Sequence, residues 1–97
     1  MQKQWVVKGQ LWNGDVIDGR GVPILILHGW GRSGAEWQGL GKKINSATGR
    51  TIYILDLPGF GGSSLPKVTR IEEYAGLVKQ WIQYLGLEQV SLAGHSL

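Results

Sequence analysis

The chain has 97 residues, enough for one small domain or for part of a larger one. Its 42% hydrophobic and 18% charged residues are typical of a globular protein, and the net charge of +3 comes from scattered Lys and Arg, so we expect neither nucleic-acid nor membrane binding. The absence of cysteine excludes disulfides and thiolate metal sites and fits a cytoplasmic protein.

No segment has the pattern of a membrane span or a signal peptide. The longest apolar run, residues 22–27, is far shorter than the ~18 residues that a membrane span requires. The first four residues are mostly polar and lead into a mixed segment rather than an apolar one. We therefore treat residues 1–97 as one unit without an internal domain boundary.

The first expected element is an antiparallel hairpin at a sheet edge. Aromatic and β-branched residues favour a strand over residues 5–8. Asn13 and Gly14 are expected to form the turn, because both central positions of a type I′ turn require positive φ, and residues 15–18 form the return strand. Three large side chains are expected to pack against the body rather than bind a ligand: Trp5, Leu11 and Trp12.

A β-α-β unit follows the hairpin. Residues 23–27 are entirely apolar, which predicts a strand covered on both faces, as in a parallel sheet. Residues 35–47 are expected to form a helix that ends at residues 48–50, and residues 51–55 form a second β-branched strand. The apolar face of this helix is predicted from three residues at helical spacing: Trp37, Leu40 and Ile44.

A second helix begins after a glycine-rich loop over residues 56–64. Thr69 and Glu72 have the spacing of a capping box, and Gly86 is placed to cap the C-terminus. The helix feeds a short apolar strand at residues 90–93. Its buried stripe is predicted to contain Ile71, Tyr74, Ala75, Val78, Trp81, Ile82 and Leu85.

The loop after the strand at residues 23–27 has two interpretations. Residues 29–34 match G-x-G-x-x-G between a strand and a helix, with Asp56 after the next strand, as in a dinucleotide-binding unit. Against this interpretation, Asp56 is somewhat too distant, and the Trp30 indole would stand where the backbone should approach a pyrophosphate. The alternative is an oxyanion loop, in which a backbone N–H faces a carbonyl oxygen that gains charge.

The end of the strand at residues 90–93 carries Gly94-His95-Ser96, which is most of a nucleophile elbow. This strand-to-helix turn is sharp and crowded, so a residue without a side chain is needed before the nucleophile, and Gly94 meets that need. Gly-X-Ser is common by itself. It indicates a nucleophile elbow only together with the motifs that precede it.

Three motifs in this order resemble the N-terminal part of an α/β-hydrolase: His28-Gly29-Trp30-Gly31, residues 56–63 (Asp-Leu-Pro-Gly-Phe-Gly-Gly-Ser) and Gly94-His95-Ser96-Leu97. Within that family the chain resembles the esterases, including those of biotin synthesis, and the carbon–carbon bond hydrolases with a His-Gly oxyanion loop. Together the motifs favour the oxyanion loop over the dinucleotide site. The resemblance implies an antiparallel hairpin plus three parallel strands and two crossover helices, with residues 23–27 between the other two parallel strands.

The resemblance also implies the roles of individual residues. Ser96 matches the nucleophile, and the backbone N–H groups of Trp30 and Leu97 match the two oxyanion donors. The acid and histidine of the triad follow the serine in this family, beyond residue 97, so neither His28 nor His95 is expected to be the base. Asp56 is expected to be structural, tying down the loop that follows it. The implied substrate is a small carboxylic ester, and no cofactor or metal is expected.

The missing triad partners imply that this chain is the truncated N-terminal part of a longer hydrolase and is inactive alone. Its last strand, residues 90–93, is then expected to self-associate through an open edge. The alternative class is a genuine short protein, a non-enzymatic half-domain that binds a ligand or dimerises. The coding sequence beyond residue 97 discriminates between these two hypotheses.

Overall fold

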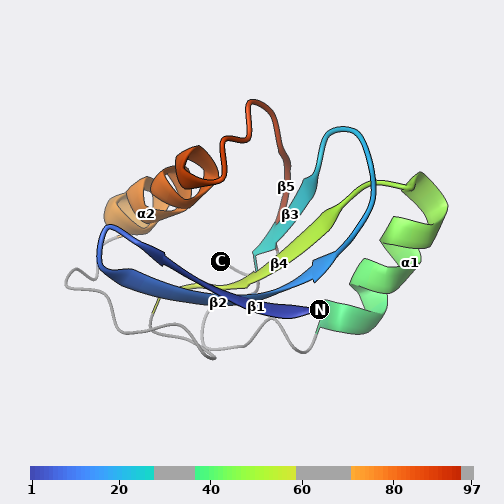
Figure 1. Ribbon diagram of the computed structural model, residues 1–97, viewed down its shortest axis with the longest axis horizontal. Helices are drawn as coiled ribbons and strands as arrows, with labels where there is room; N and C mark the ends of the chain where they lie inside the picture. The colour runs from blue at the N-terminus through green and yellow to red at the C-terminus, as the bar shows by residue number, and fades with distance from the viewer. Residues whose placement is uncertain (28–36, 59–70, 95–97) are drawn as a thin grey trace.

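The computed structural model describes residues 1–27, 37–58 and 71–94. These residues form five strands and two helices: β1 (Gln2–Val7), β2 (Gln10–Ile17), β3 (Ile24–Leu27), α1 (Gln38–Thr48), β4 (Ile52–Asp56), α2 (Ile71–Tyr84) and β5 (Ser91–Gly94). The strands form one sheet in the order β1-β2-β4-β3-β5 (Figure 1). The predicted architecture, an edge hairpin followed by three parallel strands and two helices, is confirmed.

β3 occupies the central position predicted for the apolar strand. It pairs in parallel with β4 on one side and with β5 on the other, with Ile24 opposite both Ile52 and Ser91. The Leu25 side chain is completely buried. A strand with neighbours on both edges and cover on both faces has no polar environment, which explains its uninterrupted apolar sequence.

The hairpin turn lies at Lys8 and Gly9, and the prediction of a turn at Asn13 and Gly14 is wrong. Lys8 has φ 49° and Gly9 has φ 81°, so both central positions have the positive φ of a type I′ turn. Asn13 and Gly14 lie instead within β2, where they pair with β1 on one side and with β4 on the other. A Cβ at Gly14 would stand 2.6 Å from the Ile54 carbonyl oxygen, so this glycine permits close contact between β2 and β4.

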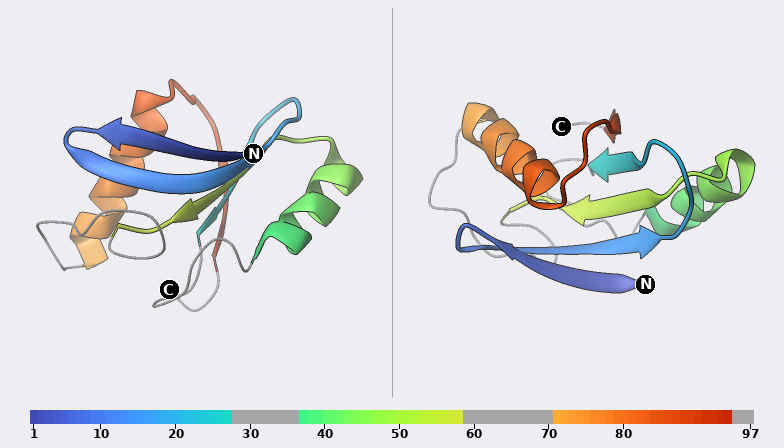
Figure 2. Two further views of the ribbon diagram at one scale, coloured as in Figure 1. Left: turned by 60° about the horizontal axis from the view of Figure 1, so that its bottom comes forward. Right: turned by 45° about the horizontal axis from the view of Figure 1, so that its top comes forward.

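The two helices cover opposite faces of the sheet (Figure 2). The core on the α2 face contains three buried tryptophans, Trp5, Trp12 and Trp81. Trp81 makes edge-to-face contacts with Trp5 at 5.4 Å and with Tyr53 at 5.2 Å between ring centroids. The predicted packing of Trp5 and Trp12 against the body is confirmed, since both are buried. The core on the α1 face consists of isoleucines from β3 and β4: Ile24, Ile26, Ile52 and Ile54.

α1 packs on the sheet through a glycine rather than through the predicted leucine. Gly41 is buried, and a Cβ there would stand 2.8 Å from Cδ1 of Ile54, whereas Leu40 is 46% exposed. Trp37 and Ile44 contact the isoleucine core as predicted. The inward face therefore contains Trp37, Gly41 and Ile44, because the missing side chain lets the helix approach the sheet. The helix ends at Gly49, whose φ of 71° is left-handed and whose N–H donates to the Asn45 carbonyl oxygen, as the predicted end over residues 48–50 requires.

α2 ends at the predicted glycine cap. Gly86 has φ 70°, its N–H donates to the Gln83 carbonyl, and the Leu87 N–H donates to the Ile82 carbonyl, which together form a Schellman motif. Val78, Trp81, Ile82 and Leu85 of the predicted stripe join the core, but Ala75 is exposed and Leu77 packs in the core instead. Thr69 of the predicted capping box lies outside the described residues.

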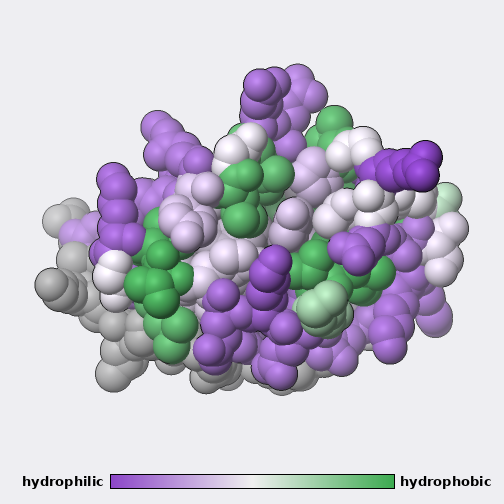
Figure 3. All heavy atoms as spheres, viewed as in Figure 1, coloured by the Kyte–Doolittle hydropathy of each residue, from purple (hydrophilic) through white to green (hydrophobic). Residues whose placement is uncertain are grey.

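Surface apolar residues are dispersed. On the face shown in Figure 3, hydrophobic residues form separate patches among polar ones. Two of the exposed large apolar residues, Val6 and Leu92, lie on the edge strands β1 and β5. No helix of the described segments is long and apolar enough to cross a membrane.

Candidate active site

The three parallel strands end at the same edge of the sheet. Leu27 at the end of β3 is the register partner of Gly94 at the end of β5 and of Leu55 in β4, which continues to Asp56. Neighbouring strands lie about 4.8 Å apart, so the chain leaves this edge at three adjacent points, toward the segments that begin at residues 28, 57 and 95. Open α/β sheets bind their ligands at the carboxyl ends of parallel strands. This edge is therefore the candidate active site.

The predicted catalytic groups belong to two of these segments and lie outside the described residues. Ser96 and Leu97 follow Gly94, and Trp30 follows Leu27. The structure thus brings together the strand ends that precede the nucleophile and the oxyanion loop, while the roles of Ser96, Trp30 and Leu97 remain predictions. The same applies to His28, to His95 and to the glycine motif at residues 29–34.

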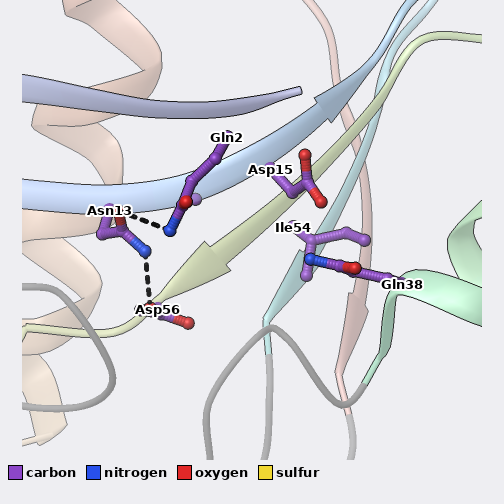
Figure 4. Close-up of a pocket in the computed structure, with 7 residues that line it drawn as sticks. Gln2, Asn13, Asp15, Gln38, Ile54 and Asp56 are labelled. Carbon is purple, nitrogen blue, oxygen red and sulfur yellow. Dashed lines mark hydrogen bonds between the residues drawn. The ribbon is translucent and has the colours of Figure 1, made fainter.

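Asp56 lies in a hydrogen-bonded pair inside the sheet. Asp56 is only 4% exposed, and the Asn13 side-chain amide donates to its Oδ2 at 3.0 Å. The Gln2 amide donates in turn to Asn13 Oδ1 at 3.5 Å (Figure 4). A buried carboxylate needs donors to replace its lost hydration. Asp56 is therefore anchored to β2, and its predicted contact with the glycine-rich loop falls mostly outside the described residues.

Beside this pair lies a cavity of about 40 Å³, which has room for water but not for a substrate. Figure 4 shows the residues around it, which come from β1, β2, β4 and α1: Gln2, Asn13, Gly14, Asp15, Gln38, Ile54 and Asp56. The N-terminal ammonium group forms an exposed ion pair with Asp15 Oδ1 at 2.8 Å. Such surface pairs contribute little to stability. The cavity is a packing feature of the sheet rather than an acyl pocket.

The described residues contain no group of three His, Cys, Asp or Glu side chains that could hold a metal ion.

The sequence did not predict Asn13 as a partner of Asp56. The sequence feature that could have predicted this partner is the Lys8–Gly9 dipeptide. It can form a two-residue turn, which would place Asn13 within the following strand.

Residues 22–97, more than three quarters of the chain, match the family model described as alpha/beta hydrolase fold. The structure also resembles that of an epoxide hydrolase, CorEH, with a TM-score of 0.85, 28% sequence identity, and coverage of 98% of this chain and 33% of that one. The described sheet order, with β3 between β4 and β5, agrees with this match. The chain belongs to the α/β-hydrolase family.

The chain is also similar in sequence to two relatives. The pimeloyl-[acyl-carrier protein] methyl ester esterase of Aeromonas hydrophila is 34% identical over 79 residues, covering 81% of this chain and 30% of the esterase. The abhydrolase domain-containing protein abhd-5.2 of Caenorhabditis elegans is 38% identical over 79 residues, covering 76% of this chain and 17% of that protein. The chain thus spans between 17% and 33% of the length of these three proteins.

Proposed function

We propose that this chain carries the nucleophile and the oxyanion donors of a serine hydrolase that acts on carboxylic esters. The observation that carries the proposal is the pairing of Leu27 with Gly94 on adjacent parallel strands. The segments that contain Trp30 and Ser96 begin at these two residues, so a serine and a donor loop start side by side at the ligand-binding edge of the sheet. The similarity to a methyl ester esterase supports an ester as the substrate class.

In the proposed reaction the Ser96 hydroxyl oxygen bonds to the ester carbonyl carbon while its proton passes to a general base. The carbonyl oxygen becomes an oxyanion, which accepts hydrogen bonds from the N–H groups of Trp30 and Leu97. Collapse of this intermediate breaks the bond to the alcohol, which leaves with the proton. Water then attacks the acyl-serine in the same way and releases the carboxylic acid, which restores the serine.

The proposed base is not a histidine of this chain. In the family that the motifs resemble, the catalytic acid and histidine follow the nucleophile, and a nucleophile elbow is expected to direct the side chain before the serine away from it. A serine hydroxyl without a base is a poor nucleophile in water. Residues 1–97 alone are therefore expected to hydrolyse esters slowly. The rate should not exceed what substrate binding and an oxyanion hole provide without a general base.

The proposal is tested with a fluorophosphonate probe and a short-chain nitrophenyl ester. The protein translated from the complete coding sequence should be labelled at Ser96, and Ser96→Ala should abolish both labelling and turnover. His95→Ala is the matched control, since it changes the adjacent residue and should leave a substantial rate. Labelling of Ser96 that is lost in His95→Ala would assign the base to His95 and contradict the proposal.

One observation favours a second candidate, a dimerising half-domain without enzyme activity. All four residues of β5 are exposed, and β5 pairs with β3 on one side only among the described strands. An open edge of this kind can accept a strand from a second copy. Hydrolysis that depends on Ser96 would exclude this candidate as the primary function.

A further inference from the structure

The dipeptide Asn13-Gly14 in β2 is a chemically reactive combination of residues. In a flexible chain, the backbone nitrogen that follows an asparagine can attack the side-chain amide carbon, and a glycine has no side chain to hinder this attack. The sequence contains two asparagines, and the other one, Asn45, precedes a serine instead of a glycine. The structure determines when Asn13 can react, because it holds the dipeptide inside the sheet.

Strand pairing holds Asn13 and Gly14 in an extended conformation. β2 pairs with β1 along one edge and with β4 along the other, and Asn13 lies opposite Gln4 in β1 and Asp56 in β4. The Asn13 side-chain amide is also held, since it donates to Asp56 Oδ2 at 3.0 Å (Figure 4). For the Gly14 nitrogen to reach the Asn13 amide carbon, the backbone must leave the extended form and the side chain must rotate away from Asp56. Both movements require β2 to separate from its neighbours.

The packing of β2 on β4 requires both residues of the dipeptide. A Cβ at Gly14 would stand 2.6 Å from the Ile54 carbonyl oxygen, so the close approach of the two strands depends on a glycine. The Asn13 amide supplies a donor to the buried carboxylate of Asp56. Replacing either residue would remove the reactive dipeptide, but it would also disturb the contact between β2 and β4.

The reaction of the separated strand would be deamidation. The Gly14 nitrogen bonds to the Asn13 side-chain amide carbon, and the amide nitrogen leaves as ammonia with the proton that the Gly14 nitrogen has lost. Water then opens the resulting succinimide at one carbonyl to give aspartate, or at the other to give isoaspartate. The reaction consumes one water, releases one ammonia and changes no oxidation state, so it needs no reagent beyond the solvent.

Neither product fits the position that Asn13 occupies. Aspartate at position 13 replaces the donor by a second carboxylate beside Asp56, which is 4% exposed. Isoaspartate lengthens the backbone by one carbon atom between positions 13 and 14. Gly14 would then move out of register with Lys3 in β1 and with Leu55 in β4. The aspartate product therefore weakens the pairing of β2, and the isoaspartate product prevents it.

We propose that Asn13-Gly14 is a deamidation site that strand pairing protects and unfolding exposes, and that its products weaken or prevent the return of β2 to its place between β1 and β4. Chemical modification of an unfolded chain makes unfolding irreversible. A chain that stays unfolded long enough to react at Asn13 is thereby removed from the fully stable population. The site limits the lifetime of the protein, and it does not depend on the proposed ester hydrolysis.

The first test compares deamidation in the folded and the unfolded protein. The protein translated from the complete coding sequence is kept in mildly alkaline buffer with or without guanidinium chloride, and peptide mapping by mass spectrometry measures conversion at position 13. Conversion should be at least about a hundredfold slower without denaturant. In denaturant, Asn13 should react at least about threefold faster than Asn45, the internal control, because a serine follows Asn45. Equal rates with and without denaturant, or equal rates for the two asparagines in denaturant, would overturn the proposal.

The second test measures whether the products refold. Incubation in mildly acidic denaturant is the matched control, because acid keeps the proton on the Gly14 nitrogen and suppresses the attack. After return to native buffer, peptide mapping of the refolded fraction should find no isoaspartate at position 13, and chains with aspartate there should unfold at the lowered urea midpoint of Asn13→Asp.

If the acid-treated protein does not refold, Asn13→Asp and the unmodified protein, both purified in the folded state, provide the comparison of urea midpoints. A midpoint of Asn13→Asp equal to that of the unmodified protein would overturn the proposal. So would isoaspartate at position 13 in chains that refold to the unmodified midpoint.

Discussion

Exchanging the partners of the buried pair between Asn13 and Asp56 is the sharpest test of how β2 and β4 are joined. Asn13 is 9% exposed and Asp56 is 4% exposed, and one hydrogen bond of 3.0 Å joins their side chains. Asn13→Ala removes one donor from a buried carboxylate, which should lower the free energy of unfolding by about 2 kcal/mol. Asn13→Asp replaces the donor by a second carboxylate.

Two carboxylates about 3 Å apart repel each other by about 5 kcal/mol at an effective dielectric constant of 20. Side-chain movement and water from the adjacent cavity should reduce the measured loss in Asn13→Asp to about 3 kcal/mol. The exchanged variant Asn13→Asp/Asp56→Asn restores an amide that donates to a carboxylate, with the two groups on opposite strands. We expect it to unfold within about 1 kcal/mol of the unmodified protein, so the two substitutions should deviate from additivity by at least ~2 kcal/mol.

The assay is urea unfolding followed by tryptophan fluorescence, at a protein concentration where light scattering detects no aggregate. Asn13→Ala separates the loss of a donor from charge repulsion, because it makes the first change without the second. An exchanged variant as unstable as the sum of its two single variants would refute the inference that the amide–carboxylate contact is what the sheet requires at this position.

Two further predictions concern the hairpin and the open edge of the sheet. Lys8→Asn should raise the free energy of unfolding by about 0.5 kcal/mol, since asparagine tolerates the positive φ that Lys8 adopts. Gly9→Ala should lower the free energy of unfolding by about 1 kcal/mol because of the φ of 81° at that residue. Equal urea midpoints for both variants would contradict the observed turn. Residues 1–97 expressed alone should self-associate through β5, and Leu92→Lys should suppress this by placing a charge on the exposed edge strand. Light scattering measures the association, and Val6→Lys on the opposite edge is the control; a monomer with a cooperative melt before any substitution would argue against an open edge.

Local patterns were sufficient for the three parallel strands, the two helices and the order of the elements, whereas they misplaced the turn of the hairpin. The apolar run before His28 predicted a central strand because a strand with neighbours on both sides has no place for a polar side chain. The glycines at positions 49 and 86 predicted two helix ends because each requires a left-handed backbone that few other residues adopt. The position of the candidate site also followed from the sequence, since parallel strands place their carboxyl ends at one edge.

Only the tertiary structure decided which face of each element is used and which polar groups meet. Asn13-Gly14 has a strong local preference for a turn, yet pairing with β4 holds it in a strand, because the free energy of a second strand partner and a buried hydrogen bond exceeds a turn preference. Gly41 replaces Leu40 at the sheet because the separation of α1 from the sheet depends on Ile54, a residue distant in sequence. The bond from Arg50 to Ser91 spans 41 positions of the chain. No local pattern predicts it, since the register that brings the two side chains together exists only once β3 has paired on both sides.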